Sequence, residues 1–387
     1  MPKHLSKTSR RDFMRLCGSS AAVLASGSAL NIAQARSIAP LSFRQGAAPL
    51  LLNFNENSLG MSKLAVEAAQ RATQTAGNRY PDGAVEQLRE SLAKLHNVAV
   101  EQIILGNGST EVIQAVVTAA EGVGCKVIEP SPTFGDVRRY AKAEGLEVIQ
   151  VAVGSGFETD IAALKKQSEA LDGPLLINIC NPNNPTGTIV DHSALVDWIT
   201  AAPAEHMFLI DEAYFEYAQL NNKYSSVLPL IQKGKENLVL TRTFSKIYGM
   251  AGMRVGYGIA AINTAKEVRK FAAGYNLSAA GTAAALASLQ DKDFYASSIE
   301  SNQSAKQILL DALDDLQLEY IESNTNFVLH KINAEVADYS ARMRDNGISV
   351  GRRMTKDDGW NRVSLATPME MSEFVKVLRA FRERAWV

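Results

Sequence analysis

The chain has 387 residues, of which 46 % are hydrophobic and 21 % charged, a composition ordinary for a globular enzyme with one large and one smaller domain. Its 40 basic and 41 acidic side chains give a formal net charge of -1, so no basic surplus favours a nucleic-acid partner. Cys17, Cys125 and Cys180 form no CxxC pair and have no metal-ligand spacing, so we predict no metal site. We expect Cys125 and Cys180 to be buried free thiols.

Residues 1–35 have the features of an export signal. The pair Arg10-Arg11 lies in a basic start, a weakly apolar stretch follows from Leu16, and Ala33-Gln34-Ala35 places small residues where a signal peptidase cleaves. This order resembles a bacterial twin-arginine signal, although an amphipathic start with a chance Arg-Arg pair is the alternative. The stretch is rich in Ala, Ser and Gly, so we expect no stable membrane insertion. We predict delivery by the twin-arginine export machinery, cleavage near Ala35 and a periplasmic or secreted protein.

The middle of the chain alternates apolar runs with amphipathic stretches, which indicates strands alternating with helices. The runs expected as strands are Ile103–Leu105, Lys126–Glu129, Glu147–Val151, Leu175–Cys180, Met207–Ile210, Leu238–Leu240 and Arg254–Ile259. The expected helices include Glu111–Ala120, Phe134–Ala143 and Ser193–Thr200. This alternation predicts an α/β fold with a mostly parallel sheet, helices on both faces and ligands at the carboxyl ends of the strands. We assign residues 80–290 to this large domain.

Two flanking regions complete the predicted organisation. After about residue 290 we expect a smaller α/β domain, residues 291–387. Its predicted elements are Ser301–Leu316, Tyr320–Lys331, Ala334–Asn346, Ile348–Val350, Arg362–Leu365 and Met371–Arg384. Residues 36–79 lack strong strand alternation, so we expect an N-terminal arm that packs with the small domain.

Lys246 is the first candidate for chemistry. It ends the sequence Thr243-Phe244-Ser245-Lys246, directly after a predicted strand, and glycines follow it. A lysine at a strand end could form an imine with an aldehyde cofactor, and Ser245 and Arg254 could reach an anion beside it. Taken alone the motif is weak, because most lysines are solvated surface charges.

Two neighbouring strand ends strengthen this interpretation. Asp211 follows one of them, where a carboxylate could keep a pyridine ring nitrogen protonated, and Tyr214 could reach a ring hydroxyl. The sequence from Asn181 to Gly187 follows the other, and its prolines and glycine fix a turn. Amides of this turn could bind the same hydroxyl, although a plain turn has the same composition.

Further segments suggest sites for a phosphate and an aromatic ring. Gly106-Asn107-Gly108-Ser109-Thr110-Glu111 follows a strand and opens a helix, whose free N–H groups and dipole favour a phosphate. A plain N-cap at Ser109 or Thr110 is compatible with the same residues. Phe134 follows another strand and could stack on an aromatic ring, although an aromatic there is more often part of the core.

Taken in order, these segments resemble the fold-type I pyridoxal-phosphate enzymes, class I/II aminotransferases, and most of all the histidinol-phosphate aminotransferase family. The resemblance extends from Asn53-Phe54-Asn55-Glu56-Asn57 through Arg79-Tyr80-Pro81-Asp82 to Arg362-Val363-Ser364. It implies the three-layer, aspartate-aminotransferase-like fold of these transferases. It also implies pyridoxal 5'-phosphate as cofactor and a homodimer with shared active sites.

The resemblance implies a role for each candidate residue. Lys246 would carry the cofactor as an aldimine and act as the acid and base, with Asp211 at the pyridine nitrogen and Tyr214 at the ring oxygen. The remaining cofactor contacts would come from Asn184 at the ring oxygen, Phe134 on the ring face, Gly108, Ser109, Ser245 and Arg254 at the phosphate, and Tyr80 of the partner subunit at the same phosphate.

Substrate recognition is implied for Arg362 and Asn55, with Arg362 binding a carboxylate or an equivalent anion through its fork of N–H groups. The amino donor would be an amino acid or a histidinol-phosphate-like amine, and the acceptor a 2-oxo acid such as 2-oxoglutarate. The family usually carries an arginine four residues after the glycine that here is Gly347, but this chain has Gly351 there, followed by Arg352 and Arg353. The sequence leaves open whether either arginine contacts the substrate.

Two other functions fit parts of this pattern. A decarboxylase or lyase of the same fold, similar to the threonine-phosphate decarboxylases, would use the same Lys246, Asp211 and Tyr214. A non-catalytic cofactor-binding protein is disfavoured because every expected catalytic position is filled.

Overall fold

The structure, a computed structural model, describes residues 41–352 and 359–387. The predicted export signal, residues 1–35, and Arg353 lie outside these ranges. Within them, no helix is long and apolar enough to cross a membrane.

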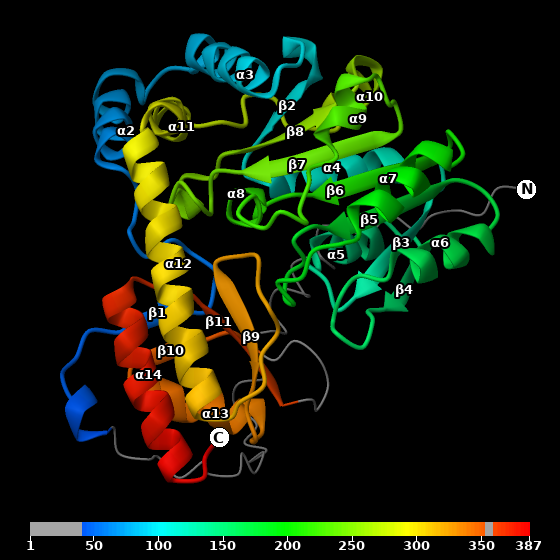
Figure 1. Ribbon diagram of the computed structural model, residues 1–387. Coiled ribbons are helices and arrows are strands. Elements are labelled where there is room, and N and C mark those ends of the chain that lie inside the picture. Colours follow the sequence, from blue (N-terminus) through cyan, green and yellow to red (C-terminus); the bar gives the residue numbers. More distant parts are fainter. Residues whose placement is uncertain (1–40, 353–358) are drawn as a thin grey trace, which may run out of the picture. The chain divides into compact units, whose positions relative to one another are not determined.

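A seven-stranded sheet forms the centre of the larger part of the chain (Figure 1). Its strands are β2 (Ile103–Gly106), β3 (Lys126–Ser131), β4 (Val148–Ala152), β5 (Leu175–Cys180), β6 (His206–Asp211), β7 (Leu238–Thr243) and β8 (Gly256–Ala260). They lie in the order β2-β8-β7-β6-β5-β3-β4, with β8 antiparallel to both of its neighbours and the pairs from β7 to β4 parallel. The predicted mostly parallel sheet is confirmed.

Helices cover both faces of this sheet. They are α4 (Ser109–Glu121), α5 (Asp136–Ala143), α6 (Ile161–Glu169), α7 (His192–Ala201), α8 (Phe215–Ala218), α9 (Leu228–Gln232) and α10 (Ile262–Arg269), with short 3-10 turns η2 (Val100–Gln102) and η3 (Ala251–Met253). In Figure 1, α4 and α5 lie behind the sheet and α6 and α7 in front of it. Along β5, Leu176 belongs to the core with α4 and α5, whereas Leu175 and Ile177 belong to the core with α6 and α7. The strands are therefore apolar on both faces, as a covered parallel sheet requires.

The helices α2 (Lys63–Ala76), α3 (Asp82–His96) and α11 (Ala279–Gln290) extend this larger part. Ala65 and Ala69 of α2 are buried in the same core as Ala284 and Ala285 of α11, and these small side chains let the two helices approach closely. The prediction that residues 36–79 pack with the small domain is therefore wrong for α2. It holds for β1 (Leu50–Leu52), which pairs with β10 (Ile348–Val350), and the turn η1 (Ser42–Arg44) precedes β1.

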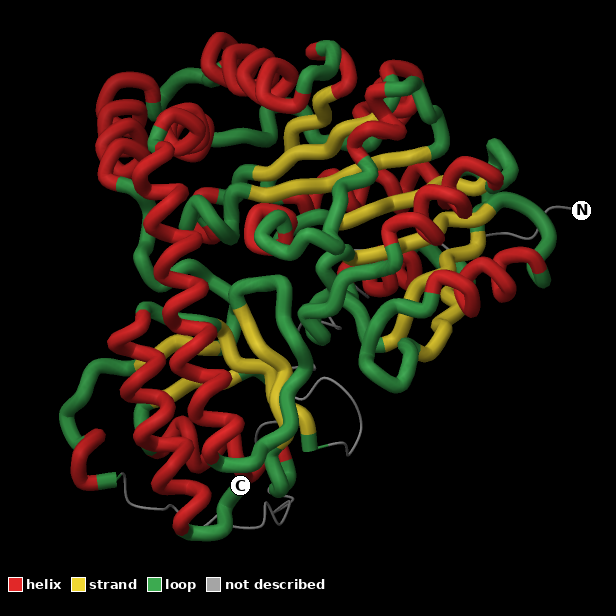
Figure 2. Tube along the Cα trace, in the orientation of Figure 1, coloured by secondary structure: helices red, strands yellow, loops and turns green. Residues whose placement is uncertain are grey.

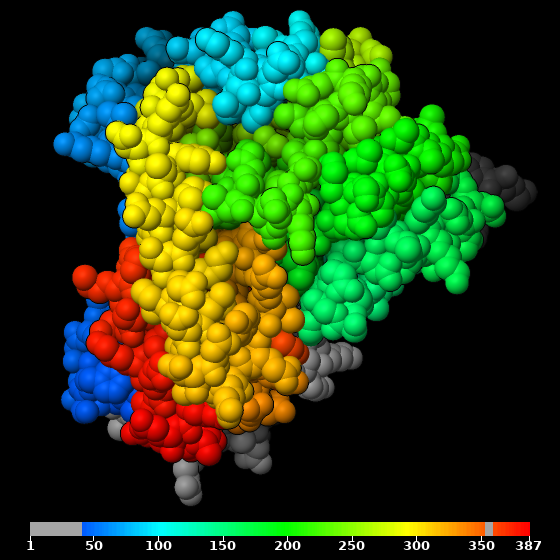
Figure 3. All heavy atoms as spheres, viewed as in Figure 1, coloured from blue at the N-terminus to red at the C-terminus, as the bar shows by residue number. Residues whose placement is uncertain are grey.

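The smaller part is an α/β unit built on two short sheets. Its remaining elements are α12 (Lys292–Asp315), β9 (Phe327–Lys331), α13 (Val336–Asp345), β11 (Trp360–Ser364) and α14 (Pro368–Glu383). Strands β9 and β11 are antiparallel, and Leu309, Leu313, Tyr339, Phe374 and Phe381 are fully buried in its core. Helix α12 runs from the larger part to the smaller part (Figure 2) and lies at the surface on the face shown in Figure 3.

Two strand boundaries differ from the prediction for local reasons. Strand β8 begins at Gly256 and not at Arg254, because Arg254 has a left-handed backbone, with φ of 55°, and closes η3. The predicted strand Tyr320–Lys331 is a hairpin, because Tyr320 folds back to bridge His330 and only residues from Phe327 onward belong to β9. The hydroxyl of Thr325 donates to Phe327 O and helps to hold the turn between them.

Candidate active site

The carboxyl ends of β5, β6 and β7 bring the predicted site residues together. Asp211 ends β6, Lys246 lies in the loop after β7 and Asn184 in the loop after β5. These three strands are parallel neighbours, so their carboxyl ends share one edge of the sheet. Residues 53–57, here called the strap, follow β1 and cross to this edge.

Lys246 contacts the strap directly. Its Nζ donates to Phe54 O at 3.2 Å and to Asn55 O at 3.1 Å. Burial, with a further contribution from the nearby charge of Arg362, lowers the pKa of Lys246 to about 8. A larger fraction of the amine is therefore neutral near physiological pH than for an exposed lysine, and the neutral amine is the nucleophile and base.

Asp211 is a buried carboxylate whose hydrogen bonds come from neutral groups. Thr241 Oγ1 donates to Asp211 Oδ1 at 3.0 Å. Burial raises the pKa of Asp211 to about 6. No ion pair within residues 41–352 and 359–387 includes Asp211, so its charge is free to pair with a cationic ligand group.

Tyr214 connects the strap to the loop after β5. Its buried hydroxyl accepts hydrogen bonds from Asn55 Nδ2 at 3.0 Å and from Asn184 Nδ2 at 3.4 Å. Burial raises the pKa of Tyr214 well above its ordinary value. The phenol therefore keeps its proton and can donate it to an oxygen of a ligand.

Arg362 projects from β11 into the same cluster. Its Nη1 donates to Asn184 Oδ1 and its Nη2 to Asn53 O, each at 2.7 Å. Its buried Nε has no hydrogen-bond partner in the described part of the chain. Arg362 and Lys246 both bond to strap carbonyls, so one short segment holds an anion-binding group and an amine near each other.

The predicted phosphate residues also come together. Ser109 opens α4, and Gly108 before it has φ of 77°, where an added Cβ would collide with the guanidinium of Arg254. Arg254 Nη1 approaches Ser245 Oγ at 3.5 Å. The helix N-terminus, a hydroxyl and an exposed guanidinium together suit a phosphate group.

Two predicted residues, Phe134 and Tyr80, and Arg352, whose role the sequence left open, have no hydrogen bond or ring contact with Lys246, Asp211 or Tyr214 in the described part of the chain. Phe134 follows β3 in a loop that is joined to the loop after β5 by a bond from Thr133 Oγ1 to Asn183 Oδ1 at 2.7 Å. Tyr80 is 72 % exposed, and its ring packs on Tyr275 with centroids 4.5 Å apart. Arg352 is exposed and lies close enough to Arg362 for their charges to interact.

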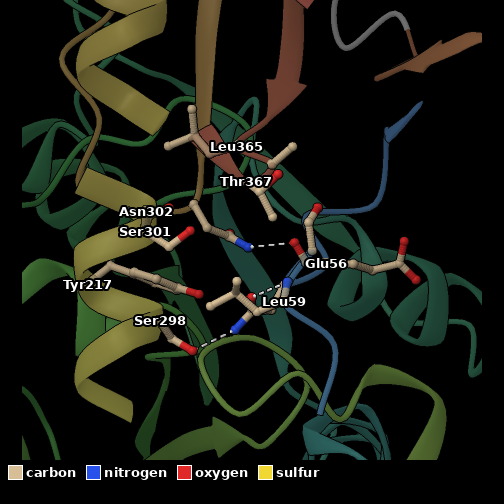
Figure 4. Close-up of a pocket in the computed structure, with 12 residues that line it drawn as sticks. Glu56, Leu59, Tyr217, Ser298, Ser301, Asn302, Leu365 and Thr367 are labelled. Atoms are coloured by element: carbon tan, nitrogen blue, oxygen red, sulfur yellow. Dashed lines mark hydrogen bonds between the residues drawn. The ribbon is translucent and has the colours of Figure 1, made fainter. Parts of the chain in front are cut away.

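A polar pocket lies beside the strap (Figure 4). Its lining includes Glu56 and Leu59, Ser298 and Ser301 of α12, and Thr367. Lys246, Asp211 and Tyr214 do not line it. The pocket therefore belongs to the support of the strap and not to the chemistry.

Sequence reasoning missed the residues that hold the others in place. Ser364 Oγ accepts from Asn55 N at 2.8 Å, Asn326 Nδ2 donates to Asn55 O at 2.9 Å, and Thr241 binds Asp211. Only Ser364 had a sequence signal, because it alternates with Arg362 along one strand and so shares its face. Asn326 and Thr241 are far from their partners in the sequence and carried none.

These residues fit pyridoxal 5'-phosphate group by group. Asp211 would hold the cofactor's pyridine nitrogen, Tyr214 its ring hydroxyl, the start of α4 with Arg254 its phosphate, and Lys246 its aldehyde. The unpaired buried carboxylate of Asp211 is the most specific feature, because a cationic ligand group would offset the cost of burying its charge. The fold and the site define a pyridoxal-phosphate enzyme with the aspartate-aminotransferase-like fold.

Comparison with known proteins identifies the family. The family Aminotransferase class I and II matches residues 48–378. A histidinol-phosphate aminotransferase of Moorella thermoacetica is 32 % identical over 329 residues, 84 % of this chain and 83 % of that protein. The chain belongs to the class I and II aminotransferases and is a pyridoxal-phosphate-dependent aminotransferase.

Solved structures agree with this assignment. A candidate histidinol-phosphate aminotransferase of Erwinia carotovora atroseptica is 40 % identical, with a TM-score of 0.85 over 88 % of this chain and 97 % of that one. A histidinol-phosphate aminotransferase of Sinorhizobium meliloti in complex with pyridoxal-5'-phosphate has the same fold at 24 % identity and a TM-score of 0.76, covering 92 % of this chain and 100 % of that one.

Proposed function

We propose that the protein transfers an amino group from an amino acid or a histidinol-phosphate-like amine to a 2-oxo acid such as 2-oxoglutarate. The observation that carries this proposal is the shared strap contact of Lys246 and Arg362. One supplies the amine for the reaction and the other the anchor for an anionic substrate group. The names of similar curated relatives, which are histidinol-phosphate aminotransferases, support the histidinol-phosphate-like donor.

The bound cofactor supplies an aldehyde that condenses with amines and a ring that takes up an electron pair. Lys246 removes and returns the substrate proton at Nζ, which its lowered pKa of about 8 permits near neutral pH. When Nζ is free, the carbonyls of Phe54 and Asn55 hold it within reach of the site.

The other residues orient and tune the site. Ionised Asp211 would keep the ring nitrogen of the bound cofactor protonated, and Thr241 orients the carboxylate through its hydrogen bond to Oδ1. Tyr214 accepts two side-chain hydrogen bonds and directs its own proton to the ring oxygen. Arg362 orients the substrate through its anion.

The decisive experiment measures both products of a half-reaction. Purified protein loaded with pyridoxal 5'-phosphate is mixed with a panel of amino donors that includes histidinol phosphate. Conversion of the cofactor to its amine form, with one keto product per site, is expected. Release of carbon dioxide without a keto product would support the decarboxylase alternative and sink the aminotransferase proposal for this chain.

We also propose a homodimer in which Tyr80 of the partner subunit contacts the cofactor phosphate. The exposure of the Tyr80 and Tyr275 rings, 72 % each, supports an interface there. Sedimentation equilibrium tests the dimer. Mixing inactive Lys246→Ala and Tyr80→Ala chains tests shared sites, because a mixed dimer would regain one intact site.

Finally, we propose that residues 1–35 direct export through the twin-arginine machinery. The Arg10-Arg11 pair and the small residues ending at Ala35 support this. Replacing both arginines with lysine should leave the protein in the cytoplasmic fraction, whereas unchanged fractionation would contradict the proposal.

A further inference from the structure

We propose that Trp360 and Phe157 close the active site just beyond Arg362. They limit the donor's anionic group to an α-carboxylate and exclude a phosphate ester on an additional methylene. This inference rests on the proposed function and narrows its substrate class to α-amino acids.

Residues along strand β11 lie at increasing distance from Lys246. Ser364, Arg362 and Trp360 alternate along it and share one face. Ser364 bonds Asn55, whose carbonyl holds Lys246, and Arg362 bonds the strap one step further out. Each two-residue step along a strand is about 7 Å, so Trp360 lies one step beyond the anion-binding group.

Trp360 meets a residue of the larger part of the chain at this position. Its ring packs edge-on against Phe157, with centroids 5.0 Å apart and an interplanar angle of 64°. Phe157 has a left-handed backbone, with φ of 64°, and its carbonyl accepts from Thr188 Oγ1 at 3.1 Å, in the loop that also carries Asn184. Trp360 is only 9 % exposed. The two rings therefore form a wall, with Trp360 supplied by β11 and Phe157 by the larger part of the chain.

Gly351, the residue after β10, lies against the backbone of Arg362. Gly351 N donates to Arg362 O at 2.9 Å, and Asn361 Nδ2 donates to Gly351 O at 2.7 Å. A Cβ at position 351 would collide with Arg362 O. Gly351 therefore lets the chain pass close to the backbone of Arg362.

Arg362 itself suits a small planar anion. Two of its five N–H groups bond Asn184 and Asn53, while Nε and one N–H on each Nη remain for a ligand. Such a fork matches a carboxylate in two parallel bonds. In the donor, a carboxylate carbon is one bond from the reacting carbon, whereas the phosphorus of a phosphomethyl group is three bonds away and would meet Trp360.

Arg352 allows a test of the opposite hypothesis, that the site binds a phosphate ester. Burial lowers the pKa of Arg362, and the nearby charge of Arg352 lowers it further, so the two cations are close. A phosphate dianion would use Arg352 as its second cation. A carboxylate needs only Arg362, so Arg352 should have little effect on it.

The test uses donors that differ only at the α-substituent. L-histidine is compared with L-histidinol phosphate, and L-phenylalanine with L-phenylalaninol phosphate, in half-reactions of the cofactor-loaded enzyme. We expect kcat/KM at least tenfold higher for the carboxylate of each pair. Trp360→Ala should reduce this ratio at least tenfold by raising the activity on the phosphate esters, and Trp360→Phe, the matched control, should keep most of it.

A binding measurement makes the result independent of turnover. 3-Phenylpropanoate and 3-phenylpropyl phosphate lack the amino group and cannot react, and calorimetry gives their Kd values on the loaded enzyme. We expect the propanoate to bind at least tenfold more tightly to wild type and the gap to close in Trp360→Ala. Phe157→Ala opens the same wall from the other side and replaces Trp360→Ala if that variant does not fold.

Two outcomes would overturn the inference. One is wild-type preference for the phosphate member of the pairs, in turnover or in binding. The other is an Arg352→Ala variant that loses tenfold or more on phosphate esters while Trp360→Ala and Phe157→Ala leave both ratios unchanged. Failure of every donor to convert the cofactor would instead contradict the proposed function, and the binding arm would still decide the inference.

Discussion

Asp211 and Glu212 are adjacent, both buried, and differ in what offsets their charge. Glu212 faces a protein cation, because Arg242 Nη2 donates to its Oε2 at 2.8 Å and Ser226 Oγ donates to the same oxygen at 2.8 Å. Arg242 in turn lies against His96 and the ring of Phe215. Asp211 receives only neutral donors in the described part of the chain.

The contrast distinguishes a charge with a structural role, that of Glu212, from a charge available for function, that of Asp211. In a buried ion pair whose partners are both protein groups, each charge offsets the other, and losing one partner leaves a costly unpaired charge. A buried carboxylate without a cation costs stability until a ligand supplies the opposite charge. The same strand end therefore has one carboxylate paired within the protein and one whose charge is left for a ligand.

The largest expected effect tests the functional side at Lys246. Lys246→Ala should lower turnover by at least about a thousandfold and remove the absorbance of the lysine-bound cofactor. Its free energy of unfolding should not fall, because burial disfavours the charged amine in the folded protein at neutral pH. Cofactor absorbance, turnover and thermal unfolding check this, and a fully active variant would refute the assignment.

The adjacent carboxylates should respond in opposite ways to substitution. Glu212→Ala should lower the free energy of unfolding by about 3–5 kcal/mol, because Arg242 remains buried without a partner. Asp211→Asn should leave the cofactor-free protein as stable as wild type or more so, yet reduce turnover at least about a hundredfold. Denaturant titration of both variants measures the difference, and equal losses of stability would break the comparison.

The pH dependence of stability isolates the Asp211 carboxylate. Burial raises its pKa from 3.8 to about 6 in the folded protein, so the folded state binds the proton more tightly than the unfolded chain. Stability of the cofactor-free protein should therefore fall as pH rises from about 4 to about 6, by about 3 kcal/mol. Asp211→Asn should lack this component, and so should protein loaded with cofactor; identical slopes in all three would contradict an unpaired carboxylate.

The smallest expected effect concerns Thr241. Thr241→Val removes the hydrogen bond to Asp211 Oδ1 and should weaken cofactor binding by about 1 kcal/mol, or several-fold in Kd. Thr241→Ser keeps the hydroxyl and should bind nearly as tightly as wild type. Equilibrium titration with the cofactor measures both variants, and equal weakening in both would point to packing and not to the hydrogen bond.

The sequence by itself determined the alternation of strands and helices and the residues at the strand ends. Lys246, Asp211 and Asn184 could be placed together in advance because parallel neighbouring strands bring their carboxyl ends to one edge. The partner of Glu212 could not, because Arg242 lies on a different strand and its pairing depends on which side chains face the core.

Only the tertiary structure decided how the strap, β11 and the loop carrying Phe157 meet. Contacts such as Asn55 with Ser364 and Trp360 with Phe157 join residues that are far apart in the chain, and no local pattern of hydrophobicity or turn residues encodes them. The position of α2 was mispredicted for the same reason. Its small buried alanines pack against α11 in the core of the larger part, and this long-range contact leaves no local signal. The chemistry was therefore encoded locally at the strand ends, whereas the limits on the substrate arise from packing across the whole fold.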